Sequence, residues 1–261
     1  MNNNQVIDNF FQKFNYDSEK TLYVGIERES FISRNGLILP IVPEILPLIE
    51  LGQPKFQSFG YELSACQLEM RYGPYHISEV KGGLLSASLE LKDFEEQLKF
   101  SCYFADTAGQ EIPLDVYPDP TGRYAKIAAS LSNDILHAAC YIAGTHVHIG
   151  MPNANDALRV YNSLGKHVHK LIEMGDNSNG ERINYYKLMS SNLDPTPHEN
   201  IDSWVQHAID NGYYDDPRKN WTLIRLSIHG TIEFRMFGST PDVSKIIHWV
   251  NTCRDLCKMY L

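Results

Sequence analysis

The sequence predicts an α+β fold, with a mostly antiparallel sheet that helices cover on one side. Several short segments alternate apolar and polar residues, as half-buried strands do. Turn signals, Asn35-Gly36 and His229-Gly230, join alternating or apolar runs in the manner of hairpins. Helical patterns separate the other strands without strict strand–helix alternation. No linker or repeat divides the chain, so we expect a single domain over residues 1–261.

Strands are expected where apolar residues recur at every second position. The first runs from Thr21 to Ser33 and closes at the Asn35-Gly36 turn. The other expected strands are Lys55 to Glu62, Gln67 to Tyr72, Ile142 to Gly150, Thr222 to Ile228 and Thr231 to Phe237. Each strand would turn one face to the core and the other to a polar surface.

Helices are expected where apolar residues recur three or four positions apart. The longest such pattern runs from about Ile77 to Thr107 and would pack on one face of the sheet. Shorter patterns cover residues 5–15, 123–139, 154–174, 200–211 and 242–260. His167 and His169 lie in one of these helices, where a two-residue step turns about 200° around the axis, so we expect them to diverge on the surface.

Composition excludes several classes of protein. The net charge of −9 argues against a nucleic-acid partner. No segment holds the roughly 18 consecutive apolar residues of a membrane span, and the start of the chain lacks a signal-peptide pattern. We therefore expect a cytoplasmic protein that uses neither nucleic acid nor membrane. Cys253 and Cys257 are one helical turn apart and are expected to be buried free thiols. No Walker or G-x-G-x-x-G loop is present.

Two expected strands each place a pair of reactive side chains on one face. Glu27 and Glu29 are two residues apart, so both point to the same side of their strand. His146 and His148 repeat this spacing between flanking glycines. Imidazole binds metals, and it is a good partner for phosphate. Taken singly, the first pair is more typical of a solvated strand face, and the second is equally typical of two satisfied histidines near a core.

Further charged residues follow the same pattern. Glu233 and Arg235 form a third pair two residues apart, which alone would indicate an ion pair within a strand. Glu62 and Glu69 are seven apart, which would place them on opposite faces of one regular strand. A bend near Ser64-Ala65 would instead let both carboxylates converge.

Together these pairs predict a divalent cation site. Four or five carboxylates on one sheet face repel one another unless cations neutralise them. Oxygen ligands with one imidazole and no thiolate favour Mg²⁺ or Mn²⁺ over structural zinc. Such Mg²⁺ sites usually carry substrate phosphates, so the pattern points to nucleotide chemistry.

Four motifs in this order resemble those of the carboxylate-amine ligases of the glutamine synthetase fold, in particular the bacterial glutamate–cysteine ligase type 2 family. They are Gly25-x-Glu27-x-Glu29, Glu62 with Glu69, Gly144-x-His146-Val147-His148 and Gly230-Thr231-Ile232-Glu233-Phe234-Arg235. The resemblance runs from about residue 22 to 240. It implies a glutamine synthetase-like catalytic domain, in which a curved, mostly antiparallel sheet has helices packed on its convex face. Its concave face would form a funnel that binds ATP at one end and the acceptor at the other.

The resemblance also implies a role for each charged residue. Glu27, His146 and Glu233 would bind the Mg²⁺ or Mn²⁺ ion that holds the ATP phosphates. Glu29, Glu62 and Glu69 would bind an ion nearer the carboxylate substrate. The expected contacts to nucleotide or substrate are His148, Arg123, Arg225 and Arg235. Of these, Arg235 and Arg225 would also stabilise the transferring γ-phosphoryl group.

The implied reaction forms an amide bond in two steps. A substrate carboxylate, with glutamate as the first candidate, attacks the γ-phosphoryl group of ATP to give an acyl phosphate, and an amine then displaces phosphate. The chain departs from the family at Met236-Phe237-Gly238, where an aspartate is usual, and between Glu181 and Asp194, where few cations remain. Two alternatives stay open: a guanidino-kinase-like phosphotransferase, and a silent metal- or nucleotide-binding protein of the same fold. A homo-oligomer contact through the C-terminal helix also stays open.

Overall fold

A computed structural model describes residues 3–50, 57–190 and 192–261, and one antiparallel sheet lies at its centre. Its strands are β1 (Val24–Arg34), β3 (Gln57–Tyr61), β4 (Gln67–Tyr75), β6 (Gly144–Gly150), β7 (Ile224–Ser227) and β8 (Thr231–Gly238), in the order β3–β4–β1–β6–β8–β7. The short strands β2 (Leu37–Ile38) and β5 (Ser101–Tyr103) pair with β1. The antiparallel sheet predicted from alternation is confirmed. Of the strand expected from Lys55, residues 55 and 56 lie outside the described residues.

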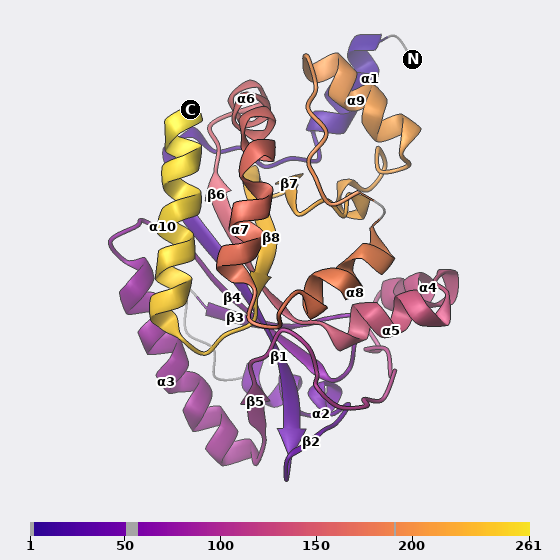
Figure 1. Cartoon of the computed structure of the whole chain (residues 1–261), viewed down its shortest axis with the longest axis vertical. Helices are drawn as coiled ribbons and strands as arrows, with labels where there is room; N and C mark the ends of the chain where they lie inside the picture. Colours follow the sequence, from indigo (N-terminus) through magenta and orange to yellow (C-terminus); the bar gives the residue numbers. More distant parts are fainter. Residues whose placement is uncertain (1–2, 51–56, 191) are drawn as a thin grey trace.

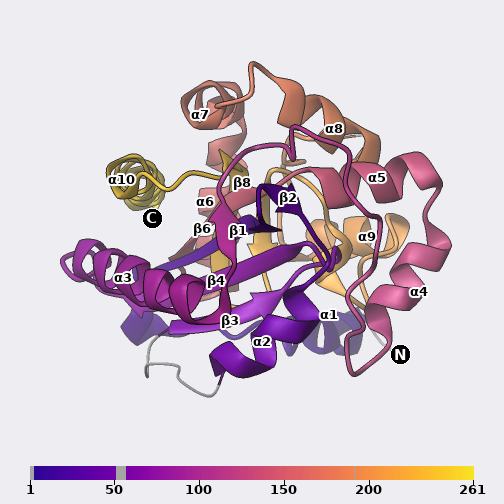
Figure 2. The same ribbon diagram turned by 90° about the horizontal axis from the view of Figure 1, so that it is seen from below.

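Helices lie on both sides of this sheet (Figures 1 and 2). They are α1 (Asn3–Phe11), α2 (Val42–Glu50), α3 (Val80–Leu98), α4 (Arg123–Ser130), α5 (Asn133–Tyr141), α6 (Ala154–Leu164), α7 (Val168–Gly175), α8 (Glu181–Met189), α9 (Ile201–Asp210) and α10 (Val243–Tyr260), with 3₁₀ turns η1 (Ser18–Lys20), η2 (Gly165–His167) and η3 (Pro217–Lys219). Helices α3, α6, α7 and α10 contact the strands on one side, whereas α4, α5 and α8 border the charged face. The expectation that helices cover one side alone is therefore wrong, because the charged face also has helical walls.

The apolar face of the sheet forms the main core. Ile26, Val147, Ile232 and Phe234 come from β1, β6 and β8, and all are fully buried. Side chains alternate along a strand, so this burial fixes the opposite orientation of the charged residues between them. The sequence prediction of one apolar and one charged face is confirmed.

Three expected helices end or break earlier than predicted. The helix expected from Ile77 to Thr107 stops at Leu98, because Lys99 adopts a left-handed conformation (φ 56°) and caps the helix. The chain then adds β5 to the edge of β1. The pattern over 123–139 divides into α4 and α5, where Leu131 is extended and the Ser132 hydroxyl accepts the Ile135 N–H. The pattern over 154–174 divides at η2.

The remaining expectations from composition concern thiols and helix length. Cys253 and Cys257 are free thiols buried in α10, as predicted. Within the described ranges, every helix is too short or too polar to cross a lipid bilayer.

Candidate active site

Strand pairing brings charged residues from distant parts of the chain into one row across the sheet. Glu27 on β1 lies opposite His146 on β6. His148 on β6 lies opposite Glu233 on β8, and Arg225 on β7 completes the row opposite Glu233. The register therefore converts the separate two-residue pairs of the sequence into one continuous polar surface.

Three residues of this row are arranged as a group that could hold a metal ion. Glu27, His148 and Glu233 each offer one ligand atom, and these atoms lie within 4.8 Å of one another. The Nδ1 atom of His148 contacts the Thr231 hydroxyl at 2.8 Å, which leaves Nε2 buried without a hydrogen-bond partner. The Nδ1 atom of His146 lies 3.1 Å from Glu27 Oε2. The resemblance suggests His146 as a ligand of this ion. In the structure the converging ligand atoms belong to Glu27, His148 and Glu233, and His146 lies next to Glu27.

The chemistry of this donor set fits a divalent cation. Two carboxylates and a buried imidazole nitrogen, His148 Nε2, which lies 3.5 Å from Glu27 Oε1, converge where bare charges are costly. Carboxylate oxygens with a single imidazole suit Mg²⁺ or Mn²⁺, and the absence of a thiolate argues against a cysteine-rich structural zinc site. The residues present are thus compatible with the ion that the sequence predicts.

Buried charge perturbs the titration of the same residues. Burial alone would raise the pKa of Glu233, but the guanidinium groups of Arg225 and Arg235 hold that pKa well below its usual range. Burial would likewise raise the pKa of Glu27, and the charges of His148 and His146 lower it overall. Burial disfavours protonated His148, but Glu27 and Glu233 raise its pKa above the ordinary value. Glu27 and Glu233 are therefore ionised in the neutral range.

A second acidic group lies next to the first. Glu29 lies opposite Glu69 in the β1–β4 pairing, and its Oε2 accepts the Gly144 N–H at 2.6 Å. Glu62 follows β3, and the chain then bends so that Gln67 N–H donates to the Ser64 carbonyl before β4 begins. Glu62 and Glu69 consequently line the same cavity. The bend predicted near Ser64-Ala65 is present, and it brings the two carboxylates together.

The carboxylates of this second group repel one another because few positive charges among the described residues lie near them. Burial, with the nearby Glu27 carboxylate, raises the pKa of Glu69 to about 7, against the opposing effect of Arg71. Burial and the Glu69 and Glu29 carboxylates raise the pKa of Glu62 well above its usual value. A cation among Glu29, Glu62 and Glu69 would relieve this repulsion.

Two arginines are held by the buried carboxylate of Glu233. Arg225 donates from Nε to Oε2 at 2.7 Å and from Nη2 to Oε1 at 3.0 Å, a bidentate pair. Arg235 donates from Nη1 to Oε1. The β6–β8 register shifts between Thr145 and Val147, so Arg235 lies at an irregularity in the pairing. Irregularities of this kind re-aim side chains next to active sites.

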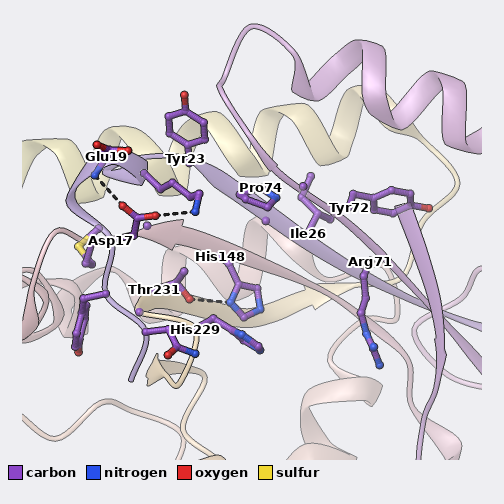
Figure 3. Close-up of a pocket in the computed structure, with 18 of the residues that line it drawn as sticks. Asp17, Glu19, Tyr23, Ile26, Arg71, Tyr72, Pro74, His148, His229 and Thr231 are labelled. Atoms are coloured by element: carbon purple, nitrogen blue, oxygen red, sulfur yellow. Dashed lines mark hydrogen bonds and ion pairs between the residues drawn. The ribbon is translucent and has the colours of Figure 1, made fainter. Parts of the chain in front are cut away.

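Two cavities meet at this row of residues. The larger, about 840 Å³, lies between the 15–20 segment, the Gly73-Pro74 turn and the β7–β8 hairpin (Figure 3). The smaller, about 250 Å³, lies between the charged face and helices α4 and α8. Glu27, His148 and His229 line both. Two of the three candidate metal ligands, Glu27 and His148, thus form part of the wall between a large and a small cavity, and Glu233 lines the small one.

Some residues of the site lay outside the sequence prediction. Arg71, the ion-pair partner of Glu69, follows the same two-residue spacing and could have been found by it. Tyr186 on α8 and Trp221 before β7 have no periodic signal, yet both line the smaller cavity. Arg123, which the resemblance suggests as a substrate contact, also lines that cavity. His169 is exposed on α7, as predicted for a residue outside the site.

Comparison with known proteins finds similarity in sequence and in structure. No known protein-family profile matches the chain. Over 120 residues it is 28% identical to a Gloeobacter violaceus protein provisionally named glutamate–cysteine ligase 2. The matched segment covers 41% of this chain and 32% of that protein. The crystal structure of a bifunctional glutathione synthetase from Pasteurella multocida is similar over 98% of this chain and 39% of its own, with a TM-score of 0.54 and 12% identity. The chain therefore spans well under half of either protein, and the second likeness shows a shared fold.

Proposed function

We propose that this chain is an ATP-dependent carboxylate-amine ligase of the glutamine synthetase-like type, which forms an amide through an acyl phosphate. The observation that carries the proposal is the position of Glu233. This buried carboxylate belongs to a metal-compatible group on one side and holds two arginines on the other. The name of the Gloeobacter violaceus relative and the motif resemblance support the same class of reaction.

The two cavities suit two substrates of different size. Pockets for cofactor-sized ligands commonly measure about 300–1,000 Å³. The larger cavity, about 840 Å³, has room for a nucleotide, and the smaller, about 250 Å³, fits an amino-acid-sized carboxylate and its amine partner. We assign ATP to the first and the carboxylate and amine to the second. The γ-phosphoryl group would then lie at the wall that both share.

The acidic residues supply the ligands for divalent ions. Glu27, His148 and Glu233 would hold Mg²⁺ or Mn²⁺, with His146 beside them, and Glu29, Glu62 and Glu69 would hold a second ion. Bound there, such an ion neutralises phosphate charge and so lets an anionic carboxylate approach. ATP and these ions are the cofactors that we propose.

The arginines have distinct tasks in this proposal. Glu233 holds Arg225 and Arg235 at the phosphoryl position, where planar guanidinium groups match phosphate oxygens. The Arg123 guanidinium makes no hydrogen bond within the described part of the chain, and its Nη2 lies 4.0 Å from Asp216 Oδ2. Asp119 accepts the backbone N–H of Arg123 at 3.1 Å and so fixes the start of α4. Arg123 is therefore available to bind the carboxylate of a substrate, with glutamate as the first candidate.

The test is phosphate release from ATP with Mg²⁺, measured together with ligated product. Amino acids serve as carboxylate donors against a panel of amines, with Glu27→Gln as the site variant and His169→Ala as the control on α7. We expect release only when donor and amine are both present, loss of turnover in Glu27→Gln, and normal turnover in His169→Ala.

Other outcomes of this assay identify the alternatives. A stable phosphorylated product formed without amide would indicate a guanidino-kinase-like phosphotransferase. Nucleotide binding without turnover on any pair would indicate a silent binding protein. Lack of Mg²⁺-dependent ATP binding would overturn the proposal.

A further inference from the structure

The side chain of Arg235 is held by Glu233, from the row of charged residues across the sheet, and by two residues outside that row. Its Nη1 donates to Glu233, and its Nε donates to the hydroxyl of Tyr186 at 3.1 Å. The indole ring of Trp221 lies over the guanidinium, with its centroid 5.7 Å from Cζ. Within the described residues Nη2 makes no hydrogen bond, and Arg235 lines the smaller cavity. Nε and Nη1 are thus bound to the protein, and Nη2 is left for a ligand.

Helix α8, which carries Tyr186, is itself fixed to the backbone of Arg235. Arg182 lies one helical turn before Tyr186 and is buried. It donates to the carbonyl oxygens of Ala143 at 2.8 Å, of Met236 at 3.2 Å and of Arg235 at 3.1 Å. Two of these carbonyls belong to β8, where the pairing with β6 is irregular. One face of α8 therefore contacts both the main chain and the side chain of Arg235.

We propose that Tyr186 is a positioning residue for Arg235, which sets the plane of the guanidinium so that Nη2 meets a phosphate oxygen. An arginine side chain has many rotamers, and a single carboxylate at Nη1 leaves the guanidinium plane free to turn. The hydroxyl at Nε removes that freedom before the ligand binds, which is how preorganised donors gain strength. The inference rests on the proposed function only for the identity of the anion.

The sequence offers a matched control on the same helix. Tyr185 is the neighbour of Tyr186, and its ring lies 4.8 Å from that of Tyr141 and 5.8 Å from that of His137, away from the cavity. Replacement of either tyrosine by phenylalanine removes one hydroxyl and keeps the ring. A difference between the two variants therefore reports on the contact with Arg235.

Trp221 provides a binding signal that does not depend on turnover. Its side chain borders the smaller cavity and is 39% exposed, whereas Trp204 and Trp249 are 3% and 1% exposed. An anion at Arg235 should change the fluorescence of Trp221 alone. A dissociation constant read from this signal is also independent of the fraction of active protein.

The experiment measures binding of magnesium pyrophosphate by Trp221 fluorescence. Loss of a hydrogen bond to a charged group corresponds to roughly 10-fold to 100-fold in an equilibrium constant. We expect Tyr186→Phe to weaken pyrophosphate binding about 10-fold, at the low end of that range, with Tyr185→Phe unchanged. In an Arg235→Lys background, which has no Nε donor at that place, Tyr186→Phe should add no further loss.

Three results would overturn the inference. They are equal affinities in the two tyrosine variants, a Tyr186→Phe loss that persists in full beside Arg235→Lys, and no response of the wild-type protein to pyrophosphate. Failure of the proposed function has a different signature. If no donor and amine pair gives an amide while the variant pattern for pyrophosphate holds, the positioning role stands and the ligase activity falls.

Discussion

Replacement of Glu233 by glutamine should weaken the fold as well as stop turnover. The Glu233 side chain is 0% exposed and is the shared partner of Arg225 and Arg235. Glutamine keeps the shape of the side chain but carries no charge. The substitution would therefore leave two guanidinium groups without the anion that now offsets their burial.

The magnitude follows from what each arginine retains. Loss of one partner of a buried ion pair typically costs about 3–5 kcal/mol of unfolding free energy. Arg225 also donates to the carbonyl oxygens of Arg218 at 3.0 Å and Asn220 at 3.1 Å, and Arg235 also donates to Tyr186. These contacts persist in the variant, so we expect a loss near the lower limit, about 3 kcal/mol. For a chain of this size that corresponds to a Tm decrease of about 6–12 °C.

The assay is thermal unfolding followed by calorimetry, with Glu44→Gln as the matched control. Glu44 forms an ion pair with Arg34 at 3.4 Å, but on the surface, so the same substitution there should cost less than about 1 kcal/mol. If Glu233→Gln lowers Tm no more than Glu44→Gln, then Glu233 is not the charge on which the two arginines depend. The assignment of both arginines to a preorganised phosphoryl site would then be wrong.

Three further predictions concern other parts of the molecule. Added Mg²⁺ should stabilise the metal-free wild-type protein and so raise its Tm; at 100 times Kd the gain in unfolding free energy is about 2.7 kcal/mol. His148→Gln should abolish this increase, and an unchanged response would remove His148 from the metal site. In α3, Gly82→Ala should stabilise by roughly 0.5 kcal/mol because a Cβ there meets open space. Gly83→Ala should destabilise by about 1–3 kcal/mol because its Cβ would lie 2.7 Å from the Tyr75 ring, and urea unfolding of the two variants shows whether their signs differ. Burial lowers the pKa of His198 to about 4, below its value in the unfolded chain. The unfolding free energy should therefore fall as the pH drops from about 6.5 to 4, by at most about 3 kcal/mol. A pH series in which the His198→Gln variant keeps the full decrease would contradict this.

The charged face could be predicted because strands have a simple period. Alternation placed Glu27, Glu29 and Glu233 on one face, and burial of Ile26 and Ile232 on the other confirms it. The convergence of Glu62 with Glu69 needed a bend, and backbone hydrogen bonds around Ser64 provide it. These features depend on local sequence, where the two-residue alternation of a strand and the signs of a bend can be read directly.

Features set by distant contacts could not be predicted in the same way. His146 and His148 are equivalent in the sequence, and the pairing of β6 with both β1 and β8 decides which imidazole faces which carboxylate. Helix α8 has almost no amphipathic pattern, since the face with Arg182 and Tyr186 meets polar groups. The smaller cavity is built by that helix, by α4 and by the segment that bears Trp221.

The placement of some site residues on sheet strands and of others on loops affects how such a protein can acquire new substrates. Glu27, His148, Glu233 and Arg235 lie on strands β1, β6 and β8, which have neighbours on both sides, so a change there disturbs the whole sheet; Arg225 lies on the edge strand β7. Three residues that line the smaller cavity, Arg123, Arg218 and Trp221, lie on a helix terminus, a 3₁₀ turn and a loop. Such segments tolerate replacement far better than central strands do. If the proposed ligase reaction holds, substitution at these positions would let selection, or a laboratory library, change the amine or the carboxylate that binds while the proposed phosphoryl site stays intact.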